Sequence, residues 1–140
     1  MAKQKIELSE LITGYKFPVT NFKLDSARVA AYIEVVDDTN TIFLNSNVVP
    51  PMSVVALAMA ELSNSISFPD GAIHVSQELT FTHPVNEGET ITSHAEVSRI
   101  QKRGNMHLLT ISLSLLKPNG IPAISGQTDF ILPSQATETK

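Results

Sequence analysis

The fold is decided by residues 50–66, which read PPMSVVALAMAELSNSI. Every residue from Val54 to Ala60 is apolar, so apolar side chains cover almost the whole circumference of a helix built from this run. We predict a helix from about Met52 to Ile66. The uninterrupted apolar run is far shorter than the ~20 residues needed to cross a bilayer. Such a helix is typical of a protein core and has to be wrapped by other elements.

The second half of the chain contains strands that could wrap this helix. Four segments alternate apolar and polar residues, the pattern of a strand with one buried face. The side chains expected on the buried faces are Ile73, Val75, Gln77, Leu79, Phe81, Ile91, Ala95, Val97, His107, Leu109, Ile111, Leu113, Leu115, Ile124, Thr128, Phe130 and Leu132. Glycine-containing turns at residues 86–88, 103–105 and 118–120 separate these strands.

Two more elements are expected in the first half. One is a strand at about Gly14–Asn21, with Tyr15, Phe17 and Val19 on one side, and the other is a helix at about Ala27–Val36. Together with the buried helix and the later strands, they predict an α+β domain with an antiparallel sheet curled round one helix. We expect this single domain at residues 1–133 and a polar tail at residues 134–140.

Composition excludes several classes of function. A net charge of −4 gives no electrostatic footprint for nucleic acid, and the absence of cysteine excludes a disulfide or a thiolate site. The four histidines show no metal-ligand spacing, so we expect no metal and no cofactor. The first seven residues lack the apolar core of a signal peptide, so we expect a cytoplasmic protein that does not bind membranes.

Three stretches resemble the MaoC-like hot-dog dehydratases. Residues 38–43, DTNTIF, are similar to the family's active-site segment, Asp-x-Asn-Pro-x-His. Residues 73–85 with 87–90 resemble its strand–turn–strand signature, and residues 48–52, VVPPM, are closest to the branch related to fatty-acid-synthase dehydratases, often the N-terminal half of a double hot dog. The resemblance extends from about residue 14 to 133. It implies a single hot-dog domain, in which an antiparallel sheet wraps one long buried helix.

The resemblance also implies a chemistry. In R-specific enoyl-thioester hydratases, an aspartate and a histidine hold a water that adds across a double bond. Carried over by position, Asp38 takes the acid/base role and Asn40 orients it. Phe43 stands where the family has histidine, so it cannot transfer a proton and is expected to line the acyl tunnel. Thr41 replaces the proline of the motif.

The implied binding residues lie on the buried helix and the first strand after it. The amides of Met52 and Ser53 are the candidate oxyanion donors, because Pro50 and Pro51 have no N–H. Gln77 falls on the expected inward face, where it either lines the acyl tunnel or finds a buried hydrogen-bond partner.

These residues imply an acyl-thioester-binding subunit of an enoyl-CoA hydratase or (R)-3-hydroxyacyl-thioester dehydratase, with an incomplete active site. Its substrate would be an acyl-CoA or acyl-carrier thioester, and a second hot-dog chain, in a homodimer or heterodimer, would complete the chemistry. An autonomous hydratase using Asp38 and a non-catalytic acyl-CoA-binding protein stay open as alternatives. An acyl-CoA thioesterase is the weaker alternative, because Glu61 lies about 200° round the helix from the expected acid position.

Two histidines carry expectations of their own. His74 is the candidate to replace the missing histidine, although simple alternation points it away from Leu79 and Phe81. His107, on an apolar strand face, is expected to be a hydrogen-bonded core or interface residue.

Overall fold

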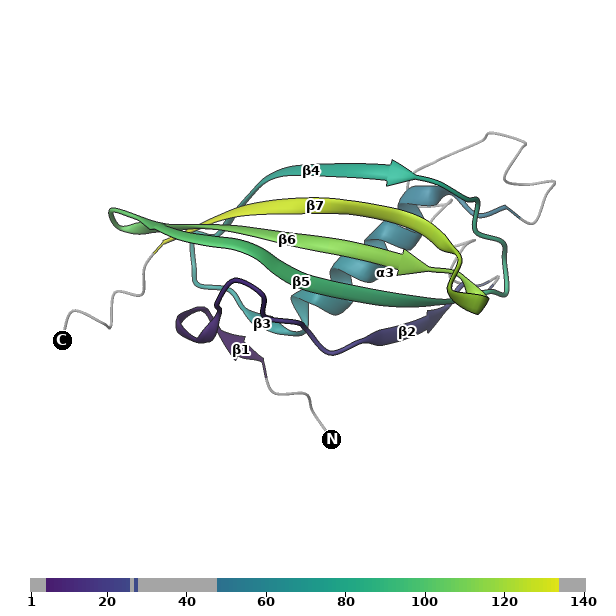
Figure 1. The fold of residues 1–140 in the computed structure, drawn as a ribbon, viewed down its shortest axis with the longest axis horizontal. Coiled ribbons are helices and arrows are strands. Elements are labelled where there is room, and N and C mark those ends of the chain that lie inside the picture. The colour runs from purple at the N-terminus through teal and green to yellow at the C-terminus, as the bar shows by residue number, and fades with distance from the viewer. Residues whose placement is uncertain (1–4, 26, 28–47, 134–140) are drawn as a thin grey trace.

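One curved sheet and one helix dominate the computed structural model, which describes residues 5–25, 27 and 48–133. The helix is α3 (Pro51–Ser63), and it crosses one face of the sheet (Figure 1). The sheet has the strand order β2-β5-β6-β7-β4, and all neighbouring strands are antiparallel. Its strands are β2 (Thr20–Lys23), β4 (Ile73–Phe81), β5 (Thr90–Arg103), β6 (Met106–Leu116) and β7 (Pro122–Pro133). The α+β prediction is confirmed.

Short elements join these parts. Strands β1 (Ile6–Glu7) and β3 (Ile66–Ser67) pair in parallel, and the 3₁₀ turns η1 (Leu8–Glu10) and η2 (Pro118–Gly120) follow β1 and β6. The turns predicted at residues 103–105 and 118–120 connect β5 to β6 and β6 to β7. Both use positive φ angles, at Gly104 (59°) and Gly120 (76°), which glycine adopts without steric cost.

The helix ends three residues earlier than predicted. The hydroxyl of Ser65 donates to the carbonyl of Glu61 at 3.2 Å, and the Ser65 carbonyl accepts the N–H of Ile6 at 2.9 Å. These bonds turn the chain out of the helix, so that Ile66 becomes part of β3. The expectation of an all-round buried helix is also wrong, because Met52, Ala56 and Ala60 are exposed.

The core lies between one face of α3 and the inner face of the sheet. Near the start of the helix, Val54, Val55 and Ala58 pack with Val49, Val85, Ile91, Leu115 and Ile124. Near its end, Leu62 packs with Leu8, Leu11, Phe17, Val97, Leu109, Ile111, Phe130 and Leu132. Met59 touches both clusters. The inward faces predicted for β6 and β7 are therefore confirmed, apart from His107, which is half-buried.

A bulge at Val75 overturns the simple alternation predicted for β4. Gln77 pairs with Thr128, but His74 pairs with Phe130, so β4 contains one more residue than β7 between these pairs. The extra residue shifts the side-chain pattern by one position. His74 therefore lies on the inner face, whereas Ile73 and Val75 are 57% and 52% exposed rather than buried. A second bulge, at Ser98 of β5, lies at the same level of the sheet.

The first predicted strand also differs from the structure. Residues 14–17 contact β5 through single hydrogen bonds, such as the N–H of Phe17 to the carbonyl of Ala95 at 3.0 Å. Pro18 has no N–H to donate, and the regular strand β2 begins only at Thr20. Phe17 is buried as expected, but Val19 is 51% exposed. Apart from Ala27, the helix predicted at Ala27–Val36 lies outside the described residues, and so does the tail at residues 134–140.

Candidate functional site

The N-terminus of α3 is built around two prolines. Pro50 precedes the helix and Pro51 is its first residue, so Met52 carries the first helix N–H. Met52 is 43% exposed. The early N–H groups of a helix lack intrahelical partners and favour negative charge. The backbone here can therefore donate to an oxygen on which negative charge develops.

Ser53 stabilises this helix start. Its hydroxyl donates to the carbonyl of Pro50 at 2.6 Å, and its own N–H donates to the same carbonyl at 2.9 Å. The side chain is buried, with 4% of the residue exposed. The Ser53 N–H thus already has an acceptor within the chain. The Met52 N–H is therefore the better candidate to bind an oxygen of a ligand.

An apolar hollow of about 260 Å³ lies beside the helix start. Its lining residues are Pro51, Phe81, Thr82, His83, Pro84, Val85 and Ile124. Phe81 is 48% exposed, which is unusual for an aromatic ring on the inner face of a sheet. A hollow with this lining favours an apolar ligand.

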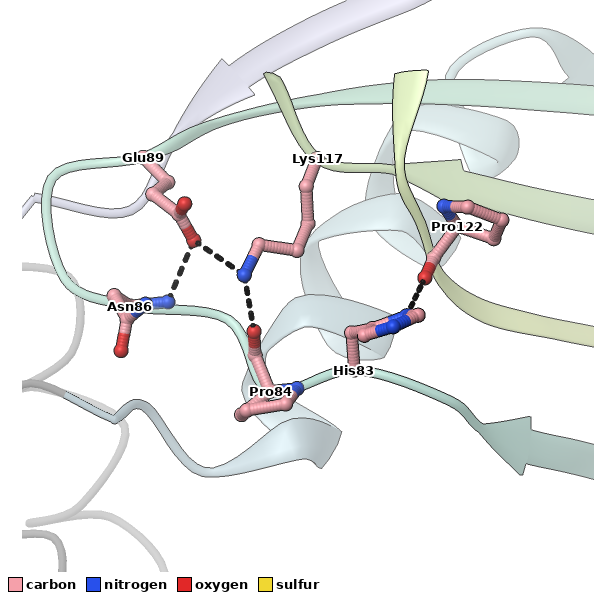
Figure 2. Close-up of polar contacts among 6 residues, drawn as sticks. All are labelled: His83, Pro84, Asn86, Glu89, Lys117 and Pro122. Atoms are coloured by element: carbon pink, nitrogen blue, oxygen red, sulfur yellow. Dashed lines mark hydrogen bonds and ion pairs between the residues drawn. The ribbon is translucent and has the colours of Figure 1, made fainter. Parts of the chain in front are cut away.

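Residues 82–86, which we call the wall segment, form most of the lining and are bonded to two neighbours. On one side, the N–H of Thr82 donates to the carbonyl of Ala123 at 2.7 Å, and Nδ1 of His83 lies 2.7 Å from the carbonyl of Pro122 (Figure 2). On the other side, the N–H of Val49 donates to the carbonyl of Val85 at 2.9 Å. The wall segment thus connects the start of β7 to the residues just before α3.

Gln77 lies on the same inner face as Phe81, roughly 13 Å along the strand from it. Its amide nitrogen Nε2 is buried and has no hydrogen-bond partner among the described residues. The buried partner that Gln77 was expected to need is therefore not supplied by the described part of the chain. Such an unpaired buried donor favours a further acceptor, from a ligand or from another chain.

His74 is occupied by structural contacts. Its Nε2 lies 2.6 Å from the hydroxyl of Thr128, and its ring stacks on Phe130 with a centroid distance of 5.0 Å. The bulge turns His74 inward, contrary to prediction, but these contacts leave it poorly suited to replace the missing histidine. His107 was expected to be hydrogen-bonded, yet its buried Nδ1 has no partner within the described residues.

The remaining predicted residues are of two kinds. Asp38, Asn40 and Phe43 lie outside the described residues, so the structure does not place them beside the hollow. Glu61 is half-buried in the last turn of α3 and lines a separate small hollow with Phe17 and Ser93.

Sequence reasoning missed one polar cluster on the outer face of the sheet. Asp129 accepts hydrogen bonds from the hydroxyls of Ser76 and Thr110, both at 2.6 Å. These bonds favour the ionised form and lower the pKa of Asp129, with a smaller contribution from the nearby His74 and Arg99 charges. The cluster fastens the edge strand β4 beside its bulge. Sequence alternation identifies the outward face but cannot show which polar residues pair across strands.

Two classes of site are not found in the described part of the chain. No group of three or more histidine, aspartate or glutamate side chains could hold a metal ion there. Within the same residues, no helix is both long and apolar enough to span a membrane.

Comparison with known proteins relates this site to a family. Residues 12–124 match the family model described as FAS1-like, dehydratase domain region. Over 71 residues the chain is 35% identical to the mitochondrial 3-hydroxyacyl-[acyl-carrier-protein] dehydratase FERN of Solanum lycopersicum. That match covers 51% of this chain and only 42% of the relative.

Solved structures show the same fold. The (R)-hydratase from A. caviae involved in PHA biosynthesis has a TM-score of 0.74 and 23% identity, with 89% of this chain and 98% of that chain covered. The C-terminally truncated HadBC (3R-hydroxyacyl-ACP dehydratase) complex of Mycobacterium tuberculosis has a TM-score of 0.73 and 18% identity, covering 89% and 99%. Both likenesses support the predicted hot-dog fold. With the family model matching most of its length, the chain belongs to the FAS1-like dehydratase domain region, within the MaoC-like hot-dog dehydratases.

Proposed function

We propose that this chain binds acyl thioesters as a subunit of an enoyl-thioester hydratase or (R)-3-hydroxyacyl-thioester dehydratase. The observation that carries the proposal is the apolar hollow beside the helix start at Pro51 and Met52. An acyl thioester has an apolar chain next to a carbonyl that becomes an enolate during hydration. The hollow can take the apolar chain, and the Met52 N–H can donate to the carbonyl oxygen. The thiol would be CoA or an acyl carrier.

The proposed chemistry assigns one role to each predicted residue. The Asp38 carboxylate, oriented by Asn40, takes a proton from the water that attacks C3 of the enoyl group. Negative charge then develops on the thioester oxygen, where Met52 is the main N–H donor and Ser53 contributes only by sharing the N–H it gives to Pro50. The protonated Asp38 then gives this proton to C2, which completes the addition of one water and returns Asp38 to its carboxylate form.

Phe43 limits this chemistry. Its side chain cannot hold a water or transfer a proton, and the loss of one acid/base group costs about 10²–10⁴ in rate. We propose that Phe43 and Gln77 instead line the acyl site. An isolated chain would then bind the thioester but hydrate it slowly.

A second hot-dog chain would complete the active site. The similar HadBC (3R-hydroxyacyl-ACP dehydratase) structure is that of a complex, which supports a partner of this kind. We propose a homodimer or a heterodimer, located in the cytoplasm, although the tomato relative is mitochondrial by name.

A pair of measurements on the purified chain tests the proposal. Calorimetry should detect binding of 3-hydroxybutyryl-CoA, while loss of enoyl-thioester absorbance with crotonyl-CoA should be slow. Adding a hot-dog chain that carries the complete Asp-x-Asn-Pro-x-His segment should raise the hydration rate above the sum of the two chains alone. Absence of binding would contradict the proposal.

A further inference from the structure

We propose that Lys117 is a positioning residue for the start of α3 and for the adjacent hollow. Lys117 directly follows β6, on the turn that leads to β7, and it is not among the residues that line the hollow. Its effect would be transmitted through the wall segment. The assignment of this place to thioester binding rests on the function proposed above, but the positioning role can be measured without it.

The Lys117 ammonium fixes the outer side of the wall segment. Its Nζ donates to the carbonyl of Pro84 at 2.7 Å and lies 3.6 Å from Oε1 of Glu89 (Figure 2). The same Glu89 oxygen accepts the backbone N–H of Asn86 at 2.8 Å. One cation therefore holds Pro84 directly and Asn86 through a carboxylate. Only 14% of the Lys117 side chain and 24% of the Glu89 side chain are exposed.

On its inner side, the wall segment bonds through residues 84–86 to the chain that leads into the helix. Val85 accepts the N–H of Val49 at 2.9 Å, and Asn86 forms a β-bridge with Val48. Val49 and Val85 are both buried in the cluster that contains Val54 and Val55 of the helix. Pro84, Val85 and Asn86 thus lie between Lys117 on one side and the residues preceding Pro50 on the other.

This arrangement predicts a local rather than a global role. The Lys117 and Glu89 side chains both still reach solvent, so water can hydrate the groups that lose their partner when the Lys117 charge is removed, and the fold should stay intact. The wall segment also keeps its second attachment, from His83 to Pro122. The Lys117 ammonium instead keeps the wall segment at a constant distance from Pro51. These two parts of the chain form opposite sides of the hollow.

Hydrogen exchange of the full-length chain tests the role directly. In Lys117→Met, which keeps an unbranched side chain one atom shorter and removes its charge, the amides of Val49 and Asn86 should exchange about tenfold faster. The amides of Ile111 and Leu109 in the central strand β6 should be unchanged. Lys117→Arg should restore wild-type exchange, and Lys102→Met, which removes the same charge from an exposed hairpin, should have no effect.

Binding provides the second readout. The dissociation constant for 3-hydroxybutyryl-CoA should rise roughly three- to tenfold in Lys117→Met and return to the wild-type value in Lys117→Arg. Unchanged exchange at Val49 in Lys117→Met would overturn the positioning role, as would faster exchange throughout the sheet. A wild-type chain that fails to bind the thioester would overturn the proposed function, and the exchange data would still decide the role of Lys117.

Discussion

At the scale of single residues, Phe43 and Asp38 separate binding from chemistry. We expect Phe43→His to raise the rate of crotonyl-CoA hydration by at least ~10-fold, because it restores a group that can hold the attacking water and move its proton. The gain is limited by Thr41 and by the two prolines, which can misplace the water. The measurement is loss of enoyl-thioester absorbance.

Two variants complete this test. Phe43→Leu, which changes the side chain without adding a proton carrier, should show no such gain. Asp38→Asn in the Phe43→His background should abolish the gain. Rapid hydration by the wild-type chain that persists in Asp38→Asn would place the chemistry on other residues.

Asp129 should make stability depend on acid. The hydroxyls of Ser76 and Thr110 lower its pKa in the folded state, so its ionised form stabilises the fold at pH values above ~3.9, the usual value for an unfolded aspartate. This contribution is lost as the pH falls through the lower, folded pKa. Urea unfolding should therefore show Asp129→Asn to be less stable than wild type at pH 6, and the difference should shrink towards pH 2.

The exposed Asp70 offers a matched comparison for this acid dependence. Asp70→Asn removes one carboxylate from the surface without touching the cluster at Asp129. The stability of Asp70→Asn should still fall as the Asp129 carboxylate is protonated, because the cluster at Asp129 is unchanged. If the stability difference between Asp129→Asn and wild type did not change with pH, the hydroxyls of Ser76 and Thr110 would not stabilise the ionised form of Asp129.

At the scale of elements, the helix contributes most through the face that meets the sheet. Leu62 is buried in the core, whereas Leu57 is half-buried and packs on the cluster near the helix start. Leu62→Ala should cost ~2–5 kcal/mol, and Leu57→Ala should lie near the lower end of that range. Urea denaturation measures both. An unchanged midpoint for Leu62→Ala would show that the helix is not part of the core.

The edge of the sheet depends on a glycine. A Cβ placed on Gly126 of β7 would overlap the backbone carbonyl oxygen of Glu78 in β4. Gly126→Ala should therefore force the two strands apart and destabilise the protein by about 1–3 kcal/mol. Its exposed neighbour provides the control, since Ser125→Ala should be nearly neutral. Equal stability of the two variants would show that β4 can shift without cost.

Most elements could be predicted from the sequence because local chemistry determines them. Proline marks the helix start, and glycines mark the turns before β6 and β7. The errors arose where distant contacts decide the outcome. Ile66 left the helix because it pairs with β1, and His74 turned inward because β4 bulges against β7. The network of Lys117 and Glu89 joins residues far apart in the sequence, so no local pattern reveals it.

At the scale of the whole molecule, β4 is an edge of the sheet, with β7 as its one neighbouring strand among the residues that the structure describes. It exposes Ile73, Val75 and Phe81. Exposed apolar edges favour pairing with another strand. We expect light scattering to report a dimer at micromolar concentration, with a two-fold axis relating either two copies or two related chains.

A charge on this edge should disrupt the assembly. Val75→Lys introduces a side chain that blunts edge pairing and leaves the core untouched. The variant should dissociate to a monomer without loss of helical circular dichroism, whereas Lys102→Met should remain dimeric. A stable wild-type monomer at micromolar concentration would contradict the proposed assembly.

The bulge at Val75 changes which mutations this strand tolerates. Loss of a residue from a strand normally reverses the faces of all side chains on one side of the deletion. Here Val75 is the extra residue, so its deletion leaves His74 opposite Phe130 and Gln77 opposite Thr128. Deletion of Val75 should therefore be milder than substitution of either paired neighbour. One residue can therefore be lost from the strand at this point while the order of side chains that face the core stays the same.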